Sequence, residues 1–136
     1  TVQQLTQGQK TLENVTIGES IKNVINHYGT PIYSYNPNNQ EKYYEFHTNK
    51  GVLVVTAIGK KNTGYVTRVS MTYNQANGPT YQKVAQSVGK KAIKRVQYNS
   101  VSGNFAYIQN GKTSYQFGSS SPKDKVLKLY RIDINK

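Results

Sequence analysis

The stretch that decides the fold is TIGESIKNVINHYGTP, residues Thr16–Pro31. Its apolar side chains recur at the spacing i, i+3, i+4 and i+7, namely Ile21, Val24, Ile25 and Tyr28. This spacing places them on one face of a helix. Gly29 then offers a residue suited to the left-handed conformation that ends many helices, and Pro31 prevents the helix from continuing. The sequence therefore predicts a short amphipathic helix with a sharp end.

A similar pattern returns about sixty residues later in the stretch 77–90, NGPTYQKVAQSVGK. Tyr81, Val84, Ala85 and Val88 occupy the matching apolar positions. Gly78 and Gly89 correspond to Gly18 and Gly29 in the first stretch. The recurrence indicates a duplicated unit.

Segments with β-branched and aromatic residues, separated by turn residues, follow each helix. We expect strands at Ile32–Tyr35, Lys42–Thr48, Val52–Ile58 and Tyr65–Tyr73, and again at 92–98, 104–109, 112–117 and 126–134. Side chains expected to point inward, toward the helices, are Tyr44, Phe46, Val54, Tyr115 and Phe117, and those expected on the inward side of the fourth strand are Tyr65, Val69, Met71 and Tyr73.

The predicted fold class is α+β, with two tandem helix-plus-four-strand units that form one antiparallel sheet and pack their helices on one face. We expect residues 1–136 to form a single domain, in which 1–15 is an N-terminal arm, 16–74 is the first repeat unit and 77–135 is the second. The first ten residues of the arm are expected to fray.

The net charge of +12 is unevenly distributed along the chain. Between Glu45 and Asp124 there are 11 Lys or Arg residues and no carboxylate. Such a charge attracts polyanions and acidic partners, although a basic surface also simply keeps a protein soluble. The predicted anion patch consists of Lys60, Lys61, Lys90, Lys91, Lys94 and Arg95. The alternative role of the last four is to stabilise the C-terminus of the second helix.

Several functional classes find no support in the residues. The chain has no cysteine, which removes disulfides and thiolate chemistry, and it has no apolar run long enough to span a membrane as a helix. His47 lies two residues from Glu45 on the same predicted strand face, so the two side chains can touch, but no G-x-S-x-G nucleophile motif occurs. We expect no enzymatic activity, no metal and no cofactor.

The other candidate site is the sheet face opposite the helices. Its predicted members are Tyr43, Glu45, His47, Arg68, Lys112, Gln116 and Arg131. Tyr and Arg are frequent in binding hot spots, although the same composition is typical of a solvated antiparallel sheet. The aromatic and basic interleaving of RNA-binding sheets is missing, so sequence-specific nucleic-acid binding is not expected.

Gly18, Ser20, Val24, Gly29 and Pro31 carry a family resemblance. Their spacing resembles the signature of the β-lactamase inhibitor protein-like (BLIP-like) superfamily, with the helix motif of the SmpA/OmlA and CAP-associated proteins. The second stretch departs from it by having Lys91 near the position of the proline. The resemblance implies two tandem units in one sheet that grips a partner protein, and it implies binding in place of catalysis.

These observations lead to two functional hypotheses. The first is a secreted, non-enzymatic bacterial protein-binding module, such as an inhibitor or a host- or envelope-directed factor; the second is a basic adhesion protein that binds a polyanion or a cell-wall polymer. The chain starts at Thr1 with a polar run, which fits either a protein whose signal peptide has been removed or a trimmed form of a longer chain, and we favour secretion.

Overall fold

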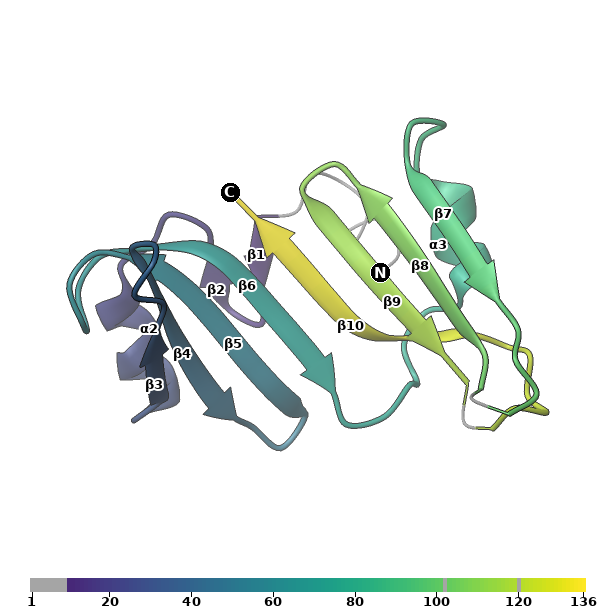
Figure 1. The fold of residues 1–136 in the computed structure, drawn as a ribbon, viewed down its shortest axis with the longest axis horizontal. Helices are drawn as coiled ribbons and strands as arrows, with labels where there is room; N and C mark the ends of the chain where they lie inside the picture. The colour runs from purple at the N-terminus through teal and green to yellow at the C-terminus, as the bar shows by residue number, and fades with distance from the viewer. Residues whose placement is uncertain (1–9, 102, 120) are drawn as a thin grey trace. The chain divides into compact units, whose positions relative to one another are not determined.

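The computed structural model describes residues 10–101, 103–119 and 121–136. The expectation that the first ten residues fray falls almost wholly outside this range. The chain separates into two compact units, which we call the N-terminal unit (10–72 with 133–136) and the C-terminal unit (73–132). The last residues of the chain therefore complete the unit in which the described chain begins (Figure 1).

Each unit contains one described helix, which is followed by four strands. The elements of the N-terminal unit are β1 (Thr11–Leu12), β2 (Val15–Thr16), α2 (Ile21–Tyr28), β3 (Ile32–Tyr35), β4 (Glu41–His47), β5 (Gly51–Ile58) and β6 (Tyr65–Tyr73). Those that follow are α3 (Tyr81–Ser87), β7 (Ile93–Gln97), β8 (Phe105–Asn110), β9 (Thr113–Gly118) and β10 (Lys128–Asn135), which ends in the N-terminal unit. The predicted helices and strands are confirmed to within a few residues at each end.

Eight of the strands form one antiparallel sheet in the order β3-β4-β5-β6-β10-β9-β8-β7, and β1 pairs with β2 in a separate hairpin. β3 and β7 are the two edge strands of the large sheet. Within the described residues, no helix is long and apolar enough to cross a membrane.

Both helices begin with a hydroxyl cap. The Ser20 side chain accepts a hydrogen bond from the Lys22 N–H, and the Thr80 side chain accepts one from the Lys83 N–H. At the end of α2, Gly29 has a φ of 90°, and its N–H donates to the Ile25 carbonyl. The capping residues thus explain why each helix has about two turns.

The core is built mainly by the strands. Tyr44, Leu53 and Val55 are fully buried in the N-terminal unit, and Tyr115 and Phe117 are fully buried in the C-terminal unit. Each helix adds an aromatic contact to its own unit. The Tyr28 ring lies 5.5 Å from that of Phe46, and the Tyr81 ring lies 5.5 Å from that of Phe117.

The prediction of an α+β fold made of two helix-plus-four-strand units is wrong. The structure is mostly β, with 47% strand and 12% helix. Its helices have eight and seven residues and bury only Ile21 and Val24 in α2 and Val84 in α3. They cover parts of a core that strand side chains fill, so they do not form a layer of their own.

Two of the expected inward side chains were also assigned to the wrong side. Tyr65 is 64% exposed, because the buried positions of β6 shift from Val66 to Val69 and break the alternation of two. Val54 pairs with Glu45, whereas the buried Tyr44 pairs with Val55. Val54 therefore lies on the opposite face from Tyr44.

Candidate functional site

The predicted binding face of the sheet divides between the two units, which are described separately. In the N-terminal unit, β4 carries Tyr43, Glu45 and His47 on one face. His47 Nε2 lies 2.6 Å from Glu45 Oε2, so the predicted contact between them is confirmed. The His47 side chain is 62% exposed and the Glu45 side chain 38%, so solvent weakens this contact.

Arg68, on β6, has a partner that sequence reasoning did not assign. Its Nη2 donates to Asp133 Oδ1 over 3.1 Å, and the Ser70 hydroxyl donates to the same oxygen. The Asp133 side chain is almost completely buried, whereas the Arg68 side chain is 43% exposed. Arg68 therefore compensates a buried carboxylate and still shows part of its guanidinium to solvent.

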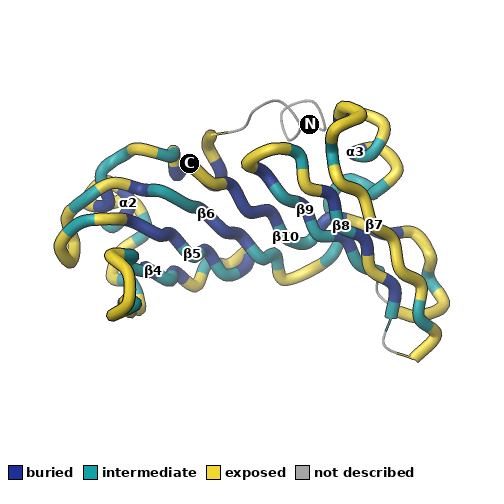
Figure 2. Tube along the Cα trace, turned by 45° about the horizontal axis from the view of Figure 1, so that its top comes forward, coloured by how far each residue is buried: buried dark blue, intermediate teal, exposed yellow. Residues whose placement is uncertain are grey.

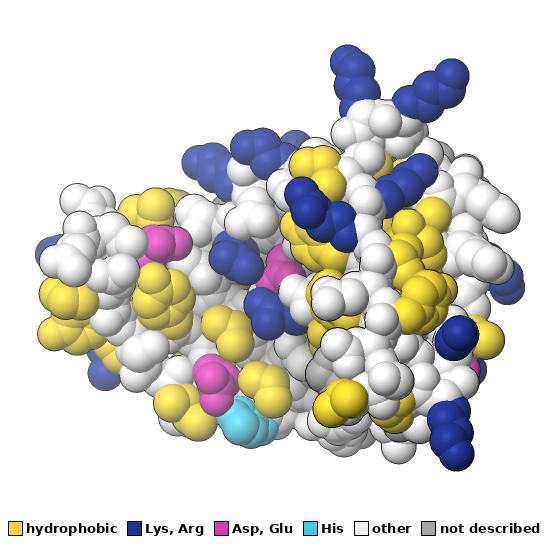
Figure 3. Space-filling view, turned by 45° about the vertical axis from the view of Figure 1, so that its right-hand side comes forward, with side chains coloured by type: hydrophobic (Ala, Val, Ile, Leu, Met, Phe, Trp, Pro, Cys, Tyr) yellow, Lys and Arg dark blue, Asp and Glu magenta, His cyan; other side chains and the backbone are white. Residues whose placement is uncertain are grey.

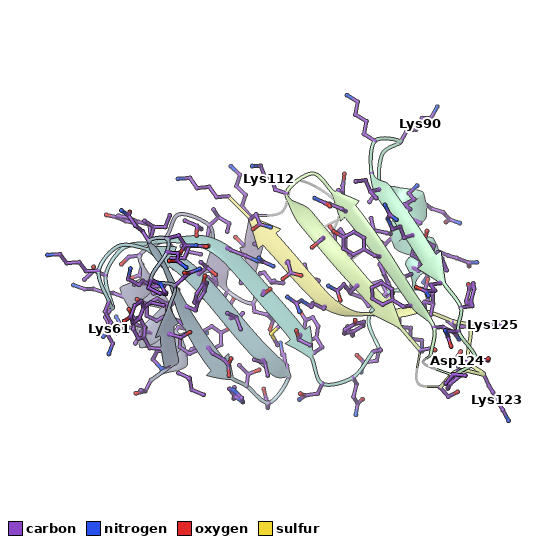
Figure 4. The ribbon with its side chains drawn as sticks, in the orientation of Figure 1. Lys61, Lys90, Lys112, Lys123, Asp124 and Lys125 are labelled. Carbon is purple, nitrogen blue, oxygen red and sulfur yellow. The ribbon has the colours of Figure 1, made fainter. Side chains whose placement is uncertain are left out.

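The three residues of the predicted binding face that belong to the C-terminal unit have different surroundings. Lys112 is exposed at the turn between β8 and β9 (Figure 4), and Arg131 is half-buried on β10. Gln116 Oε1 accepts a hydrogen bond of 3.0 Å from the Tyr130 hydroxyl. Burial raises the pKa of Tyr130, and the charge of Arg131 lowers it by a smaller amount. Tyr130 therefore remains a neutral donor to Gln116 at physiological pH.

The predicted anion patch divides in the same way. Lys60 and Lys61 lie in the turn after β5 of the N-terminal unit, where Lys61 Nζ is 4.7 Å from the centre of the Tyr33 ring. In the C-terminal unit, all four predicted cations are exposed: Lys90, Lys91, Lys94 and Arg95. The structure thus brings these four together along one short segment, the loop before β7 and β7 itself.

β7 combines these cations with exposed apolar side chains. All five of its residues are exposed, including Ile93 at 49% and Val96 at 41% (Figure 2). Hydrophobic side chains and Lys or Arg side chains lie next to each other on the face of the C-terminal unit that Figure 3 turns toward the viewer. Apolar and charged side chains on both faces of one strand are typical of a sheet edge. The same mixture of apolar and basic residues is visible in the sequence of this segment.

A small pocket lies beyond the end of β7. It has a volume of about 110 Å³ and is lined in part by Tyr81, Tyr98 and Val126. Tyr98 and Val126 are exposed, and Lys125 Nζ lies 5.8 Å from the centre of the Tyr98 ring. The pocket therefore combines aromatic walls with a nearby positive charge, and no sequence prediction included it.

The described residues contain no cluster of side chains suited to bind a metal ion. Across residues 10–101, 103–119 and 121–136, no group of three or more His, Asp or Glu side chains is arranged to hold a metal ion. His27 packs edge-on against Tyr28, with ring centres 4.7 Å apart. The arrangement that stands out is the exposed strand β7, with its apolar side chains and the basic side chains in it and just before it.

Comparisons with known proteins give one match. Neither the curated proteins nor the solved structures contain a significant match to this chain. The model of the SA0570-like family matches residues 1–135. This chain therefore belongs to the SA0570-like family.

Proposed function

We propose that this protein is a secreted, non-enzymatic module that binds another protein and needs no cofactor. One observation carries the proposal: Ile93 and Val96 are exposed on the edge strand β7, which has two cations in it and two more just before it. Apolar side chains gain free energy when a partner removes them from water, at roughly 25 cal/mol for each Å² buried. Charges around them add selectivity and speed to association. Roles as an inhibitor or as a host- or envelope-directed factor are forms of this proposal, consistent with the BLIP-like resemblance.

A second candidate is adhesion to a polyanion or a cell-wall polymer. It is favoured by the charge of the C-terminal unit, where residues 73–132 include ten Lys or Arg and a single carboxylate, Asp124. Binding to a polyanion depends mainly on the number of charges and decreases steeply with salt. Binding to a protein through Ile93 and Val96 keeps an apolar contribution that salt does not screen.

The two candidates are separated by measured affinities. The purified protein is panned against displayed fragments of extracellular and envelope proteins, and the dissociation constants of selected fragments are measured at about 0.05 M and 0.2 M salt. The first candidate predicts fragments with dissociation constants below about 10 µM that change by less than about tenfold between these salt concentrations. DNA, polyphosphate and polyglutamate provide the polyanion comparison.

The outcome for the second candidate is equally specific. If only the polyanions bind, with little selectivity among them and a loss of about a hundredfold or more at 0.2 M salt, the protein-binding proposal is wrong. Charge reversal at all four cations then has to abolish binding: Lys90, Lys91, Lys94 and Arg95. Binding that survives this reversal excludes the anion patch.

A further inference from the structure

β7 has an unpaired side. It stands last in the strand order and pairs only with β8, from Ile93 opposite Gln109 to Gln97 opposite Phe105. Alternate backbone N–H and C=O groups of an edge strand point away from its neighbour. Within the described part of the chain, the backbone of β7 forms no hydrogen bonds to a segment other than β8. As far as residues 10–101, 103–119 and 121–136 are concerned, these outward groups are available to another extended strand.

The charge of this edge selects the kind of strand that fits. Lys94 and Arg95 lie within β7, and Lys90 and Lys91 lie just before it. The other edge strand of the sheet, β3, contains no charged residue. An extended segment with Asp or Glu side chains therefore finds opposite charges along β7, whereas a basic segment is repelled.

The side chains of β7 provide positions for apolar anchors. Lys94 and Val96 pair with Ile108 and Ala106, which are buried, so these two side chains lie on the core side of the strand. Tyr98 follows at the next position of the same alternation and lines the pocket beyond β7. An added strand thus has an apolar neighbour in Val96 and a pocket next to Tyr98. Strand addition draws affinity from backbone hydrogen bonds and specificity from such sites.

We propose that β7 is the docking edge for an extended acidic segment of a partner protein, which adds to the sheet as a further strand and places an apolar side chain near Tyr98. This inference rests on the proposed protein-binding function and specifies its partner. The competing explanation is that the cations only protect an exposed edge from unwanted pairing. That explanation predicts no binding of any strand to β7.

The probe is a monomeric eight-residue peptide in which Glu alternates with Val or Tyr. Two comparison peptides carry the same charge: one with the same residues in blocks, and polyglutamate. We expect the alternating peptide to bind at least tenfold more tightly than either comparison peptide in isothermal titration calorimetry at about 0.15 M salt.

Matched variants at the two sheet edges locate the binding. Val96→Glu places an acidic group on β7, and we expect it to weaken binding of the alternating peptide more than tenfold. Ile32→Glu makes the same kind of change on β3, where Ile32 is 62% exposed, and we expect less than a twofold effect. Circular dichroism verifies that both variants fold. Equal effects of the two substitutions overturn the proposal.

The peptide backbone provides a test that does not depend on any variant. N-methylation of alternate residues in one set blocks the N–H groups that face β7, and methylation of the other set blocks those that face solvent. Strand addition predicts that one set loses binding at least tenfold and the other keeps it. Bound peptide also has to slow amide hydrogen exchange within 93–97. Equal effects of both methylated sets, absence of this protection, or absence of binding overturn the proposal.

Failure of this inference differs from failure of the proposed function. Selected protein fragments that bind tightly, but neither compete with the alternating peptide nor depend on Val96, leave protein binding intact and refute strand addition. Absence of any selected protein fragment refutes protein binding itself.

Discussion

The hydroxyl of Tyr115 provides the sharpest test of how the core is packed. Tyr115 is fully buried on β9, and its hydroxyl has no hydrogen-bond partner within the described chain. A buried hydroxyl without a partner costs about 1–3 kcal/mol. Tyr115→Phe removes this cost and leaves only a small void. We therefore expect the free energy of unfolding at pH 7 to stay equal or to rise by up to about 2 kcal/mol.

The same substitution has a second effect at high pH. Burial raises the pKa of Tyr115 to about 12, compared with its ordinary value of about 10. Below pH 10, Tyr115 is neutral in both the folded and the unfolded state. Its titration therefore does not lower the free energy of unfolding in that range. As the pH rises from 10 to 12, the unfolded chain releases the proton first, and the folded state loses up to about 2.7 kcal/mol at 1.36 kcal/mol per pH unit. At pH 11 the advantage of Tyr115→Phe is thus greater by about 1.4 kcal/mol than at pH 7.

The assay is urea unfolding followed by circular dichroism at pH 7 and pH 11, because the chain contains no tryptophan. Tyr44→Phe is the matched control at pH 7. Tyr44 is equally buried, but its hydroxyl accepts a hydrogen bond from the Asn62 N–H over 2.9 Å. We expect this control to lose about 0.5–1.5 kcal/mol. A loss above about 1 kcal/mol for Tyr115→Phe at pH 7, or an effect that is equal at both pH values, would refute the reasoning.

Four further substitutions test other parts of the structure by the same unfolding assay at pH 7. Gly64→Ala should cost at least about 3 kcal/mol, because Gly64 has a φ of 97° and a Cβ there would overlap the Ile58 carbonyl oxygen. Gly111→Ala is the comparison: Gly111 has a φ of 63° and free space around it, so this substitution should cost only about 1 kcal/mol. Val84→Ala should cost about 1–3 kcal/mol because Val84 is the buried contact of α3, and a neutral result would mean that α3 does not pack on the core. Asp133→Ala should cost about 1–3 kcal/mol because it leaves the Ser70 hydroxyl and the Arg68 guanidinium without this acceptor, and an unchanged midpoint would show that the cluster adds no stability.

Local sequence patterns were sufficient to predict the two described helices and the eight strands of the large sheet, but not the β1-β2 hairpin. α2 ends just before Gly29, as Gly29 and Pro31 predicted. The alternation of residues 42–48, KYYEFHT, correctly predicted β4. The predicted fold class is wrong because periodicity does not reveal how many helical side chains become buried. In α3, only Val84 is buried. The prediction that Tyr65 points inward is wrong for a related reason. A local break in strand alternation depends on backbone pairing, which side-chain patterns do not specify.

The candidate site was predictable only in part. The cluster of Lys90, Lys91, Lys94 and Arg95 was evident from the sequence, but its meaning depends on the position of β7 in the sheet. Strand order arises from pairing between distant segments, and hairpin turns constrain only neighbours in the chain. The pocket next to Tyr98 required the same long-range information, because Tyr81, Tyr98 and Val126 come from three separate segments.

The charge on β7 also disfavours pairing of this exposed apolar edge with the same edge of a second copy. In an edge-to-edge contact between two copies of this chain, Lys94 and Arg95 of one copy would lie close to the same residues of the other, and like charges across paired strands are destabilising. Ile93 and Val96 supply attraction without selectivity, while the cations decide which strands are admitted. An acidic segment meets both requirements at once, since its charges replace the repulsion with attraction and its backbone completes the hydrogen bonds that β7 leaves open. In our proposal, the cations that disfavour pairing with a second copy are therefore the same groups that attract an acidic partner.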